Sequence, residues 1–135
     1  MWNILIVEDD KSAREVFALA LKDKANCVMA ENAQKAMDAY TLSIRKGEQF
    51  DLILLDITLP DRSGMRILEE IREKERRIGY KRHQQIPIII VTGTSEKAVV
   101  LEACQKGCHD YVVKPVENSV LIEKIEKNIN KKNSQ

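Results

Sequence analysis

Five polar residues of this sequence have side chains that can do chemistry, and each follows closely after a short apolar run. Three carry carboxylates, one carries a hydroxyl group and one carries an amino group. They are Glu8, Asp9, Asp56, Thr92 and Lys114.

Three carboxylates brought to one place repel one another and raise one another's pKa unless a cation is present. Magnesium is the natural cation, because it prefers oxygen ligands and usually takes one or two carboxylates together with phosphate oxygens. Two or three acids without a histidine argue against zinc or copper. We therefore expect Glu8, Asp9 and Asp56 to form a Mg²⁺ site, and we expect no organic cofactor.

The same residues suit phosphoryl transfer, a reaction that depends on positioning and charge neutralisation. The carboxylate of Asp56 can act as a nucleophile and form an acyl phosphate. Lys114 and the metal would neutralise charge on the phosphoryl oxygens, and the Thr92 hydroxyl can donate a hydrogen bond to them. Asp56, Thr92 and Lys114 are thus the predicted catalytic residues, with Asp56 as the phosphorylation site.

The elements that position these residues alternate along the chain. Continuous apolar runs, typical of strands buried on both faces, are followed by amphipathic segments with helical spacing. Five strands and five helices are expected, and Gly47, Gly79 and Gly107 stand where helices should end. The strands are expected at 3–7, 26–30, 51–55, 86–91 and 109–113.

A strand followed by a helix five times over requires parallel strands, because each crossover returns the chain to the same edge of the sheet. The predicted fold is α/β, a single-domain doubly wound parallel sheet with helices on both faces. The carboxyl ends of such strands share one rim, where ligands bind. The five polar residues should therefore meet there, although Asp10 alone needs no more explanation than a helix cap.

Four segments resemble the receiver domains of two-component response regulators, the CheY-like superfamily. The resemblance covers the whole chain and rests on the acidic turn after the first strand, the strand and loop around Asp56 with Gly64, the strand ending in Thr-Gly, and Tyr-Val-Val-Lys-Pro. The segments are 4–10, 51–60, 88–93 and 111–115. The resemblance implies the flavodoxin-like strand order 2-1-3-4-5.

The resemblance also implies roles for individual residues. Mg²⁺ would be bound by Asp9, Asp56 and the backbone carbonyl of Thr58, with Glu8 as the second acid of the pair. Thr92 and Tyr111 would form a switch, in which the hydroxyl moves toward the phosphoryl group and the ring turns inward. The Lys114–Pro115 peptide bond would be cis.

The implied function is that of a phosphoacceptor switch rather than a conventional enzyme. Asp56 would accept a phosphoryl group from a sensor histidine kinase or a histidine phosphotransfer protein, the domain would catalyse its own phosphorylation and dephosphorylation, and a protein-binding surface would change. The downstream protein is not identified. Thr94, near the pocket mouth, is at a position where relatives differ in dephosphorylation rate.

Two rival functions fit the sequence less well. A phosphatase of the haloacid dehalogenase type would carry Asp-x-Asp, whereas the motif here is Asp56-Ile57-Thr58. A flavin or dinucleotide binder would have a glycine-rich loop after the first strand, which here is acidic. A third alternative concerns context: the chain can act inside a larger complex or be part of a longer regulator or hybrid kinase.

Length and composition limit the remaining possibilities. The 135 residues predict one domain at 1–130 and a polar C-terminal tail at 131–135. No membrane span or signal peptide is expected, which predicts a cytoplasmic protein. The formal net charge of +1 and the missing recognition helix disfavour nucleic-acid binding, and a monomer or weak homodimer is expected.

Two further features have plain interpretations. Cys27, Cys104 and Cys108 match no disulfide or zinc pattern, so reduced, buried thiols are predicted. His83 and His109 are expected at the surface or in packing. The basic stretch 72–85 carries interleaved glutamates and is interpreted as a solvated helix face, with partner binding as the alternative.

Overall fold

The chain forms a five-stranded parallel sheet between two layers of helices, as seen in a computed structural model that describes residues 1–93 and 97–134. The strand order is β2-β1-β3-β4-β5, so the predicted fold class and order are confirmed. The strands are β1 (Trp2–Val7), β2 (Ala25–Ala30), β3 (Leu52–Asp56), β4 (Ile88–Thr92) and β5 (Asp110–Val113). The helices are α1 (Lys11–Leu21), α2 (Ala33–Lys46), α3 (Gly64–Ile78), α4 (Lys97–Gln105) and α5 (Asn118–Asn133), with a 3₁₀ turn η1 (Arg82–Gln84).

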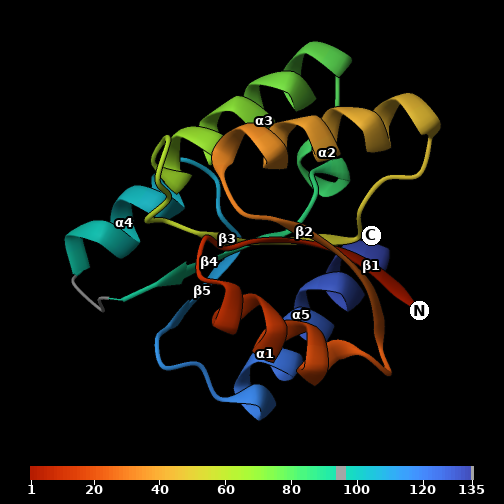
Figure 1. The fold of residues 1–135 in the computed structure, drawn as a ribbon. Helices are drawn as coiled ribbons and strands as arrows, with labels where there is room; N and C mark the ends of the chain where they lie inside the picture. Colours follow the sequence, from red (N-terminus) through yellow and green to blue (C-terminus); the bar gives the residue numbers. More distant parts are fainter. Residues whose placement is uncertain (94–96, 135) are drawn as a thin grey trace.

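Each face of the sheet has its own hydrophobic core. In Figure 1 α1 and α5 lie on one side of the strands, and α2, α3 and α4 lie on the other. Alternate residues of one strand serve the two cores: Leu5 packs on the α2 and α3 side, while Ile4 and Ile6 pack on the α1 and α5 side. This burial on both faces explains why the central strands are continuous apolar runs.

Helices begin and end at the capping residues and glycines expected from the sequence. Asp10 caps α1 by accepting a hydrogen bond from the amide of Ser12, the ordinary role expected of it. Gly47 and Gly79 end α2 and α3 in the left-handed conformation, and Gly107 also has a positive φ just after α4. The last helix, α5, continues to Asn133, so residues 131–133 of the predicted tail are helical. The boundary after residue 130 stays a prediction.

A buried charged network joins α3 to the segments that come just before β4 and β5. Arg72 and Glu75 are 3% and 1% exposed and form an ion pair of 2.6 Å. Arg72 also donates to the carbonyls of Gly107 and Ile86, and Glu75 accepts from the amide of Ile86. The prediction that this stretch is a solvated face is wrong for Arg72 and Glu75, whose partners lie far along the chain.

The cysteines are all free, but the prediction that they are buried is wrong for Cys104, which is exposed, while Cys27 and Cys108 are half-buried. Cys104 follows Ala103, the residue that α4 turns toward the core. No helix in the described part of the chain has both the length and the apolar character needed to cross a membrane.

The buried pair allows a stability test with a matched control on the same helix. Glu75→Gln replaces one of two accepting oxygens by an amide and removes the charge that balances Arg72. Breaking a buried pair in this way should lower the free energy of unfolding by about 3 kcal/mol. Glu73→Gln breaks the exposed ion pairs with Arg76, which has the same spacing, and with Arg77, and should have far less effect. Equal effects of both variants in urea unfolding would contradict this account.

Candidate functional site

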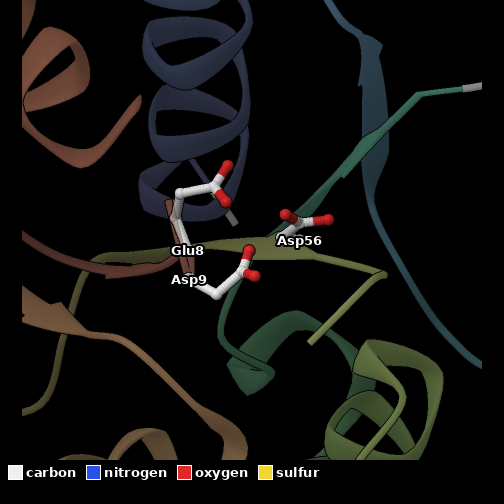
Figure 2. Close-up of side chains that lie close together, drawn as sticks. All are labelled: Glu8, Asp9 and Asp56. Carbon is white, nitrogen blue, oxygen red and sulfur yellow. The ribbon is translucent and has the colours of Figure 1, made fainter. Parts of the chain in front are cut away.

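The register of the sheet places three carboxylates side by side. β1 and β3 are neighbours, and Val7 pairs with Leu55, so Glu8 and Asp56 stand at the next position on adjacent strands. One oxygen from each of Glu8, Asp9 and Asp56 lies within 4.8 Å of the others. Figure 2 shows these side chains reaching from the ends of two strands toward one space. The structure therefore brings the three predicted acids together.

Lys114 connects two of these acids. Its Nζ atom lies 3.0 Å from Oδ2 of Asp56 and 2.9 Å from Oε1 of Glu8. Burial acts to lower the pKa of Lys114, but the contacts with Glu8 and Asp56 outweigh it and raise the pKa. Lys114 therefore stays positively charged, and its peptide bond to Pro115 is cis, as the resemblance implied.

Glu8 has the most unusual surroundings of the three acids. It is 1% exposed, and burial, followed by the nearby carboxylate of Asp56, raises its pKa to about 7 against the opposing effect of Lys114. Lys114 forms an ion pair with Oε1, but this buried oxygen has no hydrogen-bond partner among the described residues. A cation would satisfy it.

The donor set fits a hard divalent cation. The cluster contains only carboxylates, two buried and one exposed, and no other group of this kind occurs in residues 1–93 and 97–134. Oxygen ligands of this type suit Mg²⁺. The residues that would hold the ion are Glu8, Asp9 and Asp56, and bound Mg²⁺ supplies positive charge to neutralise phosphoryl oxygens.

Asp56 is held in place by its own loop and by α3. It is 3% exposed, and its Oδ1 accepts a hydrogen bond of 2.9 Å from the amide of Thr58. At Gly64, the first residue of α3, a Cβ atom would lie 2.2 Å from the carbonyl oxygen of Asp56. Only glycine lets the helix approach this closely. The predicted metal contact through the Thr58 carbonyl stays a prediction.

The two predicted switch residues lie on neighbouring strands. Thr92 ends β4 and is buried, and its carbonyl accepts from the amide of Lys114 at 2.7 Å. Tyr111 pairs with Ile90 in β5, and its half-buried ring packs against the core on the α2 and α3 side. Lys124 lies 5.0 Å from the centre of this ring. Thr94, named as a rate-affecting position, lies outside the described residues.

Two residues that support the site were missed from sequence. Arg14 donates from Nη1 to the carbonyl oxygens of Glu8 and Asp9, at 2.8 and 3.0 Å, and so fixes the acidic turn. The position of Arg14 one turn into α1, close to the acidic turn, was the sequence signal that could have revealed this contact. Asp61 accepts from the amides of Ala33 and Gln34 and ties the loop after β3 to α2. Because these partners are far apart in sequence, no local pattern could reveal that contact.

Comparison with known proteins identifies the class to which this fold and site belong. The family model described as the response regulator receiver domain matches residues 4–126. The chain belongs to this family, and it is a receiver domain of the kind found in two-component response regulators. This assignment argues against both rival functions considered from the sequence.

Individual relatives agree with the assignment. The chain is 32% identical to the chemotaxis protein CheY of Pseudomonas aeruginosa over 93% of this chain and 94% of that protein. It is 30% identical to the probable C4-dicarboxylate response regulator DctR of Bacillus subtilis over 93% of this chain and 51% of that protein. A CheY-like receiver domain structure from Methanospirillum hungatei has a TM-score of 0.83 and 25% identity, covering 99% of this chain and 98% of that one.

The chain spans about half the length of the first curated relatives that it matches, 51%, 43% and 54% of them. Receiver domains are signalling switches that generally bind Mg²⁺ and act with histidine kinases and downstream effectors.

Glu8 gives the metal-free protein a defined pH dependence. Because its folded pKa of about 7 exceeds the ordinary 4.5, the folded state binds this proton more tightly than the unfolded chain. The contribution to the free energy of unfolding therefore falls as the pH rises from about 4.5 to about 7, then levels off. Glu8→Gln lacks this proton, so in metal-free urea unfolding the variant should gain stability relative to wild type across that interval. A constant difference between the two proteins would contradict the assignment.

Proposed function

We propose that Asp56 is the phosphoacceptor of this receiver domain and that phosphorylation requires Mg²⁺ at Glu8, Asp9 and Asp56. The observation that supports this most directly is the gathering of Asp56, two further carboxylates and the Lys114 ammonium at one rim of the sheet. An isolated buried aspartate would have little reason to share its surroundings with two other acids.

The proposed reaction transfers a phosphoryl group from a phosphohistidine of a histidine kinase or phosphotransfer protein. A carboxylate oxygen of Asp56 bonds to phosphorus while the phosphorus–nitrogen bond breaks, and the histidine nitrogen leaves with that electron pair. The ammonium group of Lys114, which contacts Asp56 in the unphosphorylated protein, would shift toward the incoming phosphoryl oxygens and neutralise their charge. Hydrolysis of the acyl phosphate by water would restore Asp56, so the domain would catalyse both steps.

The proposed output is a change at the surface near β5. The Thr92 hydroxyl would turn toward the phosphoryl group, and the Tyr111 ring would move further inward from its half-buried position against the core. A downstream protein would recognise the changed surface. The phosphoryl group can shift this equilibrium only by as much as it favours the active arrangement. A cytoplasmic location and a monomer or weak homodimer complete the proposal.

Phosphorylation at Asp56 can be tested by mass. Incubation with Mg²⁺ and a small phosphodonor should add one phosphoryl group to the wild-type chain and none to Asp56→Asn, because the amide is not nucleophilic. Asp10→Asn is the matched control: it removes a neighbouring carboxylate but keeps a side chain that can cap α1. It should still be labelled. The assignment would be refuted if intact-mass spectra showed a phosphoryl group on Asp56→Asn, or if they showed none on the wild-type chain.

Metal binding can be measured separately from phosphorylation. Asp9→Asn removes the exposed acid of the cluster and should weaken Mg²⁺ binding by about tenfold or more, because a carboxylate ligand and its charge are lost. Asp10→Asn again serves as control and should change the affinity much less. Isothermal titration of the unphosphorylated protein with MgCl₂ gives both values. Equal affinities in wild type and Asp9→Asn would place the ion elsewhere.

A further inference from the structure

A second recess lies at the opposite end of the sheet from Asp56. It is a cavity of about 700 Å³ where β4 and β5 begin, formed by η1, the connection from α4 to β5, and the end of α5. Its size falls within the range of small-molecule sites. Nothing in the proposed phosphorylation chemistry uses it.

The cavity is lined by positive charge without compensating carboxylates. Arg82, Lys131 and Lys132 line it together with His83 and His109, and no aspartate or glutamate is among its lining residues in the described part of the chain. Some cations elsewhere in this protein have carboxylate partners, for example Arg62 with Glu70. Among described residues, Arg82, Lys131 and Lys132 form no ion pair.

The helix dipole explains part of this charge but not all of it. Lys131 and Lys132 lie in the last turn of α5, where cations offset the negative end of a helix. That reason does not apply to Arg82, which belongs to a different element and reaches the same cavity. Three cations from two elements therefore share a recess that has no acid among its described lining residues.

His109 adds a hydrogen-bond donor to this lining. Its Nδ1 is approached by Arg72 Nη2 at 3.1 Å and by the amide of Ile88 at 3.3 Å, so it must act as an acceptor. Burial and the nearby cations Arg72, Arg82, Lys131 and Lys132 lower the pKa of His109 to about 4. The neutral ring therefore carries its proton on Nε2.

We infer that this cavity binds a small molecule carrying two or more phosphate groups. Arginine matches phosphate oxygens with its planar fork of donors, and lysines contribute point charges. A ligand with a single negative charge would leave most of the cationic lining unneutralised. An acidic protein segment would need an extended surface, whereas these cations surround one recess.

The test uses the unphosphorylated chain in metal-free buffer, so that its result does not depend on phosphorylation at Asp56. Inorganic pyrophosphate and ADP are titrated separately by isothermal calorimetry. Saturable binding at one site is expected, with affinity reduced about tenfold or more in Arg82→Ala/Lys132→Ala. Tighter binding of ADP than pyrophosphate would identify a nucleotide site, and equal binding a site for the diphosphate group alone.

The matched control is Lys22→Ala/Lys24→Ala, which removes the same charge near the opposite edge of the sheet and should bind like wild type. Unchanged urea midpoints establish that the variants fold, and Lys131→Glu provides a second cavity variant. Binding should also raise the pKa of His109 in an NMR titration, because the anion offsets the surrounding cations. No binding, equal loss in both double variants, or tighter binding of a glutamate-rich peptide would overturn the inference.

Discussion

Repulsion among three carboxylates is the constraint that organises the functional end of this protein. Glu8 and Asp56 are both nearly inaccessible to solvent, and Asp9 stands beside them. Such an arrangement is unfavourable unless positive charge is close. Lys114 supplies a single positive charge for two of the acids, and one oxygen of Glu8 still lacks a hydrogen-bond partner among described residues. The site thus has less positive than negative charge, which suits a place where a cation binds together with a phosphoryl group.

The surrounding structure holds this unfavourable cluster in position. Arg14 binds the backbone of the acidic turn, the Thr58 amide orients Asp56, and Gly64 lets α3 begin against the Asp56 carbonyl. These contacts are to backbone or to single oxygens, so the carboxylates remain available to a ligand. Rigid positioning of this kind is what phosphoryl transfer requires of a protein, since the chemistry depends mainly on geometry and charge.

The two ends of the sheet have opposite electrostatic character. Acids gather where the strands end, and cations gather around the cavity where β4 and β5 begin. Between α3 and that cavity lies the buried pair of Arg72 and Glu75, which ties the helix to the loops before both strands. The pair is costly to desolvate, and its hydrogen bonds to backbone carbonyls and to the Ile86 amide offset that cost. It also fixes His109, one wall of the cavity.

The sequence by itself determined the fold and the membership of the acid cluster. Alternating apolar runs and amphipathic segments require parallel strands, and parallel strands put Glu8, Asp56, Thr92 and Lys114 on one rim whatever the details of packing. Only the tertiary structure decided which charges are buried. Arg72 and Glu75 follow the apolar stripe of α3, a signal that was available, but their partners at Ile86 and Gly107 are 11 to 35 residues away. The contacts of Asp61 with α2 and the cavity around His109 likewise join distant segments. Local patterns report which face of an element is apolar, whereas the partner of a polar group depends on which segments the packing brings within hydrogen-bonding distance.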